Sequence, residues 1–141
     1  MSILAFDAVA QGDELPAMRR VVTREDVKAY AAVSGDDNPL HLDDDFARAV
    51  GFDGIIAHGM FTMGHMAVAI TSWTGDPHSL LRLTASFREP VGMGEELIAG
   101  GRVKALDRET RTATLETWVA VEHDGHRKWP IKRGEAVVRL G

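Results

Sequence analysis

The residue types that could move protons are concentrated in one short segment, residues 34–41, which reads SGDDNPLH. Asp36 and His41 lie on either side of Pro39, and this proline restricts Asn38 to an extended conformation. The turn that results can bring the carboxylate and the imidazole to face one site. A carboxylate and a histidine form a workable pair for removing one proton and delivering another. The segment therefore predicts an acid–base site at Asp36 and His41.

Ordinary turn chemistry offers a second interpretation of the same segment. Asp, Asn and Pro are common in turns because their side chains or rings stabilise the tight backbone directly. On this interpretation Asp36 closes an Asx turn and His41 is an exposed loop residue. The spacing alone leaves both interpretations open.

A second segment, residues 55–60 (IIAHGM), introduces an apolar stretch that is typical of a helix. We expect that helix to begin near Gly59 and to run to Trp73. The first backbone amides of a helix have no acceptor within it, and the helix dipole there favours negative charge. Glycine lets a ligand approach the backbone closely, so a thioester carbonyl could be polarised at Gly59 as in an oxyanion hole. Tight entry of the chain into the helix is the alternative explanation for the glycine.

The elements that must position these residues are helical in the first half of the chain. Thr23 followed by Asp26 resembles a capping box, which predicts a helix over 24–33 that ends at Gly35. A short helix is expected over 43–50, since acidic residues occupy its first turn. The helix over 59–73 has almost no polar face, and a helix that is apolar all round is expected to be buried all round.

The second half of the chain shows the alternation that is typical of strands, and Asp124-Gly125 is a hairpin turn signal. The expected strands are 81–87, 97–106, 112–122, 127–131 and 134–140, preceded by a short strand at 18–22. A sheet packed on only one side of the apolar helix would leave the opposite face of that helix exposed to solvent. We therefore predict an α+β fold in which an antiparallel sheet wraps around a long buried central helix.

Composition narrows the class of protein. The 141 residues suit a single domain spanning 1–141, and the net charge of −5 argues against nucleic acid as a partner. There is no cysteine, which excludes disulfides and a thiolate nucleophile. The N-terminus has no basic region typical of a signal peptide, and the most apolar stretch contains two histidines, so we expect no membrane span and a cytoplasmic location.

Together, the SGDDNPLH segment at 34–41 and AHGM at 57–60 resemble the hydratase-2 motif of MaoC-like proteins. The TSWTGDP segment at 71–77 and the late strands are similar to the beta subunits of actinobacterial (3R)-hydroxyacyl-ACP dehydratases. The resemblance covers residues 12–140. It implies a hot-dog fold and reversible hydration between a trans-2-enoyl thioester and a (3R)-3-hydroxyacyl thioester.

The resemblance also implies roles for single residues. Asp36 and His41 match the catalytic pair of the family, Asn38 its motif asparagine, and Gly59 its oxyanion glycine. No metal or organic cofactor is implied. The substrate would be an acyl-CoA or an acyl-ACP. The family commonly forms dimers, so the implied assembly is a homodimer or a heterodimer with another hot-dog subunit.

The residues around Gly59 are the expected substrate-binding surface, namely His58, Met60, Met63 and Ala67. Ala67 departs from the family pattern, because some family hydratases carry a serine there that bonds within the active site. The methionines are read first as core residues and second as walls of an acyl tunnel. His58 shares a helical face with His65, but no third residue has the spacing of a metal ligand, so a hydrogen-bonded buried histidine is the first interpretation.

Two further functions stay open from the sequence. The chain could be a catalytic or tunnel-forming subunit of a heteromeric fatty-acyl dehydratase with little activity alone. A thioesterase on the same fold is less favoured, because it would want a carboxylate on or near the long helix and residues 60–73 contain no Asp or Glu.

Overall fold

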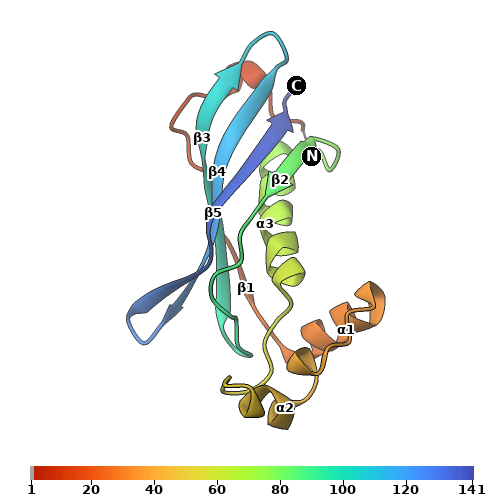
Figure 1. The fold of residues 1–141 in the computed structure, drawn as a ribbon. Helices are drawn as coiled ribbons and strands as arrows, with labels where there is room; N and C mark the ends of the chain where they lie inside the picture. The colour runs from red at the N-terminus through yellow and green to blue at the C-terminus, as the bar shows by residue number, and fades with distance from the viewer. Residues whose placement is uncertain (1) are drawn as a thin grey trace.

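The computed structural model describes residues 2–141 and contains one five-stranded antiparallel sheet with the strand order β1-β3-β4-β5-β2. The strands are β1 (Met18–Val21), β2 (Leu80–Thr84), β3 (Glu96–Asp107), β4 (Thr112–His123) and β5 (His126–Arg139). The three long strands form the middle of the sheet, and the short β1 and β2 are its edges. The sheet curls along its length (Figure 1).

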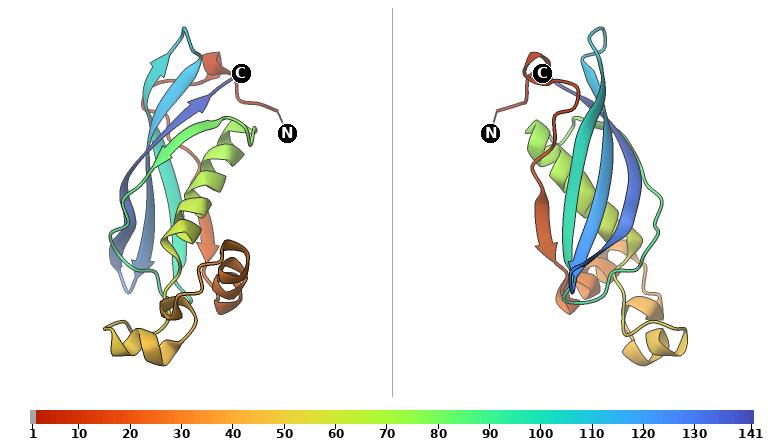
Figure 2. Two further views of the ribbon diagram at one scale, coloured as in Figure 1. Left: turned by 45° about the vertical axis from the view of Figure 1, so that its right-hand side comes forward. Right: turned by 90° about the vertical axis from the view of Figure 1, so that its left-hand side faces the viewer.

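The long helix α3 (Gly59–Thr74) lies against the concave face of this sheet, as both views in Figure 2 show. Met66 and Ile70 are 0% and 1% exposed and pack in one cluster with strand residues such as Leu97 and Leu115. Burial of such side chains is the main favourable contribution to folding. The predicted hot-dog architecture, an antiparallel sheet wrapped around a central helix, is confirmed.

The stronger expectation that α3 is buried on every side is wrong for the chain by itself. Met60 and Val68 are 56% and 52% exposed, and Gly64 lies between them on the same face. The sheet covers one side of the helix only, and the outer face is left partly open to solvent in the described residues. No helix in the described part of the chain is both long enough and apolar enough to cross a membrane.

Three short helical elements extend from one end of the sheet and carry the first motif: α1 (Arg24–Ser34), η2 (Pro39–His41) and α2 (Asp44–Ala49) (Figure 1). The predicted capping box is present, since the Thr23 side chain accepts from the Asp26 amide and Asp26 accepts from the Thr23 amide. Gly35 ends α1 in the left-handed conformation at a φ of 76°. These local signals place the start of the 34–41 segment at the end of α1.

The strand predictions need two corrections. The segments 127–131 and 134–140 are a single strand, β5, which pairs with β4 through register shifts near its middle. Proline has no backbone N–H to pair with a neighbouring strand, and glycine weakens a strand. Pro130 and Gly134 therefore suggest a break in the sequence, whereas the structure has a continuous strand there. The predicted strand 81–87 ends at Thr84, beyond which only Phe87 bridges to Ile131. The Asp124-Gly125 turn is confirmed, because both residues have positive φ.

Candidate active site

The turn that follows α1 is organised by its own side chains. The Asn38 side chain accepts the Leu40 amide at 3.0 Å and so caps η2, with Pro39 at the first helical position. The Asp36 Oδ1 accepts the Asn38 amide at 3.4 Å, and the Asp36 amide donates to the Ser34 hydroxyl at 3.1 Å. Asn38 therefore shapes the loop, and the Asx-turn interpretation of Asp36 holds for one of its two carboxylate oxygens.

His41 is held from a distant part of the chain. Its Nδ1 donates to the Ile56 carbonyl at 2.7 Å, and the Ile56 amide donates to the Leu40 carbonyl at 3.1 Å. Only 12% of the His41 side chain is exposed, so the alternative of an exposed loop histidine is wrong. The first motif is thus joined to Ile56, just before the AHGM segment, by hydrogen bonds at His41 and Leu40.

The Asp36 carboxylate and the His41 imidazole face each other, with 4.0 Å between Oδ2 and Nε2. This distance is too long for a direct hydrogen bond. Because Nδ1 of His41 carries the hydrogen given to Ile56, neutral His41 presents a lone pair at Nε2. Two acceptors therefore face one gap, and a water with one hydrogen directed to each would fit their chemistry. Asp36 is 55% exposed, so the gap is open to a ligand.

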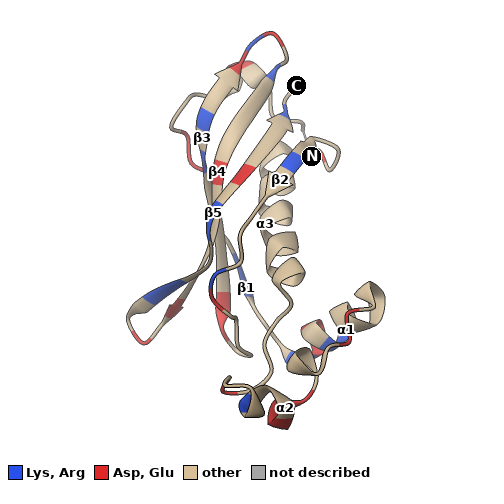
Figure 3. Cartoon of the chain, in the orientation of Figure 1, with Lys and Arg blue, Asp and Glu red and all other residues tan. Residues whose placement is uncertain are grey.

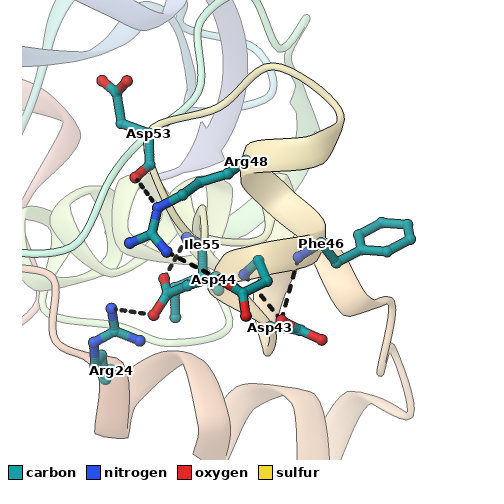
Figure 4. A network of polar contacts seen from close by, with 8 residues as sticks. Arg24, Asp43, Asp44, Phe46, Arg48, Asp53 and Ile55 are labelled. Atoms are coloured by element: carbon teal, nitrogen blue, oxygen red, sulfur yellow. Dashed lines mark hydrogen bonds and ion pairs between the residues drawn. The ribbon is translucent and has the colours of Figure 1, made fainter.

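A network of charged side chains fixes the loop that carries Ile56 (Figure 4). Asp44 accepts the Ile55 amide at 3.0 Å and forms an ion pair with Arg24 at 2.8 Å. The Ile55 amide and then the Arg24 guanidinium hold the pKa of Asp44 below its ordinary value. Asp43 caps α2, and Arg48 donates to the Asp53 carbonyl at 3.3 Å. The network ties α1, α2 and the 53–55 loop into one unit beside His41.

His58 contacts both proposed catalytic residues. Its ring stacks on His41 with 3.8 Å between centroids and 23° between planes, and its Nε2 donates to the Asp36 carbonyl at 2.9 Å. The ring of Tyr30 packs against the His58 ring as well, with 4.8 Å between centroids and 60° between planes. His58 is 1% exposed, so the structure gives it contacts behind the pair and almost no surface toward a ligand.

Gly59 begins α3 directly after His58, as predicted. Within residues 2–141 no acceptor receives the amide of Gly59 or Met60, whereas the Phe61 and Thr62 amides both donate to the His58 carbonyl. A free helix N-terminus therefore lies next to the histidine stack. A Cβ added at Gly59 would lie 3.0 Å from two ring atoms of Phe87, so the glycine also makes room for that ring.

Sequence reasoning missed Tyr30 and Phe87 as neighbours of the site. Tyr30 lies within the predicted helix over 24–33 and Phe87 at the end of the predicted strand 81–87, and neither position carries a signal for a site. The other predicted substrate-binding residues lie along α3, where Met60 is exposed while Met63 and Ala67 are half-buried. Met63 also packs against the core, which agrees with its first interpretation.

Asp36, His41 and His58 are the one set of possible metal ligands among the described residues, with atoms within 4.8 Å of one another. The geometry does not favour a metal ion. The lone pairs of two stacked imidazoles lie in nearly parallel planes and do not converge on one point, and Nε2 of His58 already donates to Asp36.

A model of the MaoC-like domain family matches residues 8–125. The chain belongs to the MaoC-like family. It is 35% identical over 122 residues to the mitochondrial 3-hydroxyacyl-[acyl-carrier-protein] dehydratase of Arabidopsis thaliana, which covers 86% of this chain and 72% of that protein. It is also 35% identical over 116 residues to the (R)-specific enoyl-CoA hydratase of Aeromonas caviae, covering 82% of this chain and 84% of that enzyme.

Solved structures of MaoC-like proteins share the fold closely. The (R)-hydratase of Aeromonas caviae superposes with a TM-score of 0.85 and 30% identity over 95% of this chain and 98% of that chain. A MaoC-like dehydratase superposes with a TM-score of 0.88 and 35% identity, and this chain spans 43% of that protein. The HadBC complex of Mycobacterium tuberculosis, a 3R-hydroxyacyl-ACP dehydratase, shares the fold at 15% identity and a TM-score of 0.70, over 91% of this chain and 96% of that chain.

Proposed function

We propose that this MaoC-like protein is a hydro-lyase that interconverts a trans-2-enoyl thioester and a (3R)-3-hydroxyacyl thioester. The observation that carries the proposal is the gap of 4.0 Å between Asp36 Oδ2 and His41 Nε2, two acceptors that face one another beside a free helix N-terminus. The names of the plant dehydratase and the bacterial hydratase support this reaction for the family.

In the hydration direction, Asp36 and His41 hold one water between them through its two hydrogens. The water oxygen forms a bond to C3 while one of the pair takes a proton from it, and the electron pair of the C2–C3 double bond moves toward the thioester carbonyl. The same proton can then be returned to C2, which completes the addition of one water. Either residue can act as the base, and dehydration follows the same steps in reverse.

The Gly59 amide supplies the electrostatic part of the proposal. Negative charge develops on the thioester oxygen as the enolate forms, and a donor fixed in advance near that oxygen stabilises it. The helix dipole acts in the same direction. A polarised thioester and a positioned base are then sufficient, so no step needs a metal or an organic cofactor.

The test of the proposal is hydratase activity on crotonyl-CoA with variants of the pair. Asp36→Asn and His41→Ala are each expected to lower kcat by about 10²–10⁴-fold while the fold is kept. Asp37→Asn is the matched control, because Asp37 is an exposed carboxylate one residue away with no part in the pair. Wild-type turnover by both Asp36→Asn and His41→Ala would contradict the mechanism, as would an equal loss in Asp37→Asn.

We further propose that the enzyme works as a pair of hot-dog subunits, in a cytoplasmic location. The exposed apolar residues Met60 and Val68 on α3, Leu81 in β2 and Phe87 after β2 are the surface that a second subunit would cover. Both a homodimer and a heterodimer with a related subunit fit this surface. Light scattering of the purified chain separates them, and a monomer that becomes active only with a partner would identify the heteromeric dehydratase.

The carrier of the acyl group is left as CoA or ACP. A cavity of about 910 Å³ between the 51–56 loop and the β4–β5 hairpin is lined by both Arg127 and Lys128 and by Glu89 and Glu95. Lys128 is bound to Glu95 and to the Pro90 carbonyl, and acidic and basic residues are interspersed over the chain (Figure 3). These balanced charges fit either carrier. The hydration rates on enoyl-CoA and enoyl-ACP substrates with the same acyl chain would identify the preferred one.

A further inference from the structure

Packing alone does not explain a histidine at position 58. Its Nε2 must be the donor in the contact with the Asp36 carbonyl, because a carbonyl oxygen only accepts. The neutral ring then carries a lone pair at Nδ1, which is buried and has no hydrogen-bond partner among the described residues. A buried acceptor without a donor is unfavourable for stability. An apolar ring would fill the same space without that cost, so the imidazole contributes something besides packing.

The contact with Asp36 is what an apolar ring would lose. Within residues 2–141, the other hydrogen bonds of Asp36 are local ones, from its amide to Ser34 and from the Asn38 amide to its carboxylate. Only the His58 bond attaches the backbone of this residue to another part of the fold. Without that bond, the position of the exposed carboxylate would be set by a short turn alone.

The second contact acts on the other member of the pair. The Nδ1 of His41 is bonded to Ile56, which fixes one edge of its ring, and the stacked ring of His58 covers one face. Rotation of His41 about its Cβ–Cγ bond would break both contacts. One buried side chain thus limits the movement of both groups that border the gap.

We propose that His58 is a positioning residue for the hydration reaction, which sets the separation of the Asp36 carboxylate and the His41 imidazole through its hydrogen bond and its stacked ring. This inference rests on the proposed function. His58 touches neither water nor thioester, and it acts through the pair. A misplacement of about 1 Å in a catalytic group can lower the rate by about 10²-fold, which sets the scale of the expected effect.

Two substitutions separate the two contacts. His58→Phe keeps a stacked ring and loses the donor to Asp36, whereas His58→Gln keeps an amide donor and loses the ring. Each is expected to lower kcat on crotonyl-CoA by about 10–100-fold and to change KM by less than about threefold, because the substrate surface is untouched. A purely structural role would lower the amount of folded enzyme and leave kcat per folded molecule unchanged.

His65→Gln is the matched control. His65 is a second buried histidine on α3, and its Nε2 donates to the Met18 carbonyl at 2.9 Å, far from the pair. The chemical change is the same as in His58→Gln, because in both variants a side-chain amide replaces a ring that donates to a backbone carbonyl. We expect a lower melting temperature and a kcat within about threefold of wild type. An equal loss of kcat in His65→Gln would overturn the specific role of His58.

Nuclear magnetic resonance of histidine-labelled wild-type protein tests the arrangement without relying on any variant of His58 to fold. The ring protons of His41, assigned with His41→Ala, should show cross-relaxation with the His58 ring, and its absence would overturn the proposal. A wild type without hydratase activity would overturn the proposed function itself. An active wild type with His58→Phe and His58→Gln near wild-type kcat would overturn the positioning role alone.

Discussion

Gly59→Ala is the substitution that most directly tests the role of the helix N-terminus. The added methyl would lie 3.0 Å from Cδ2 and Cε2 of Phe87 and 3.1 Å from its Cγ. Carbon atoms pack best at about 3.5–4.0 Å, so the ring or the first turn of α3 must move by about 0.5–1 Å. In the chain by itself, Phe87 is 51% exposed and its ring has room to move outward.

The expected cost in stability is small, because two effects oppose each other. Alanine is about 1 kcal/mol better than glycine inside a helix, although Gly59 stands at the first position, where the gain is smaller. The contact with Phe87 offsets that gain. We therefore expect the free energy of unfolding to change by less than about 1 kcal/mol, and a folded protein to be available for assay.

The expected cost in activity is larger. The thioester oxygen must come within about 2.7–3.1 Å of the Gly59 amide, and a shift of about 1 Å in that donor lowers the rate by about 10²-fold. The assay is kcat/KM on crotonyl-CoA for Gly59→Ala, Phe87→Leu and the double variant. Recovery in the double variant would mean that the loss came from the displaced ring, and no recovery would mean that the methyl itself blocks the thioester.

The reasoning would be refuted by a folded Gly59→Ala protein whose kcat/KM stays within about threefold of wild type. Such a result would leave close approach of a ligand to this amide without support. The glycine would then be explained by its contact with Phe87 alone.

Two more predictions concern stability. The pKa of Asp44 is lowered chiefly by the Ile55 amide, so its charged form stabilises the folded chain above the ordinary value of 3.8, and this contribution disappears as the pH falls through the lower folded pKa. Asp44→Asn should therefore melt below wild type at neutral pH, with the difference vanishing in melting curves recorded below that pH; a constant difference would contradict the linkage. Gly134→Ala should cost about 1–3 kcal/mol in urea unfolding, because the new Cβ would lie 3.1 Å from the Thr84 carbonyl and 3.2 Å from the Thr117 carbonyl. Gly64→Ala, with nothing within 4 Å of its added methyl, is the control and should be at least as stable as wild type.

Features that depend on neighbouring residues alone could be predicted from the sequence. The capping box at Thr23 and Asp26, the left-handed Gly35 and the turn at Asp124-Gly125 each need only three or four residues, and all are present. The helix of α3 and its contact with a sheet also followed from its apolar pattern. Local chemistry determines these features, whatever the rest of the chain does.

The outer face of α3 shows where such reasoning stops. The apolar residues Met60, Gly64 and Val68 indicate that this face of the helix is shielded from water. They do not indicate which protein surface packs against it. The predicted fold has the sheet cover the whole helix, but the sheet reaches only one side of it. A helix face that packs against another subunit and a face that packs into the core show the same apolar residues in a sequence.

The candidate site required contacts between segments that no spacing rule supplies. Asp36 and His41 lie close together in the chain, and the Pro39 turn predicts that they can meet. The bond from His41 to Ile56 and the stack on His58 join residues 15 or more positions apart. The family resemblance paired the two motifs, and it gave no reason for the histidine before the glycine.

The residues before α3 supply that reason. Ala57 donates its amide to the Val91 carbonyl at 2.8 Å, which attaches this stretch to the segment leading into β3. On one side of Ala57, the Ile56 carbonyl holds the His41 ring, and on the other side the His58 ring holds the Asp36 carbonyl. The next amide is the free donor of Gly59. Four consecutive residues therefore set the positions of both proton-transfer groups and of the proposed oxyanion donor, so a displacement of residues 56–59 would disturb all three together.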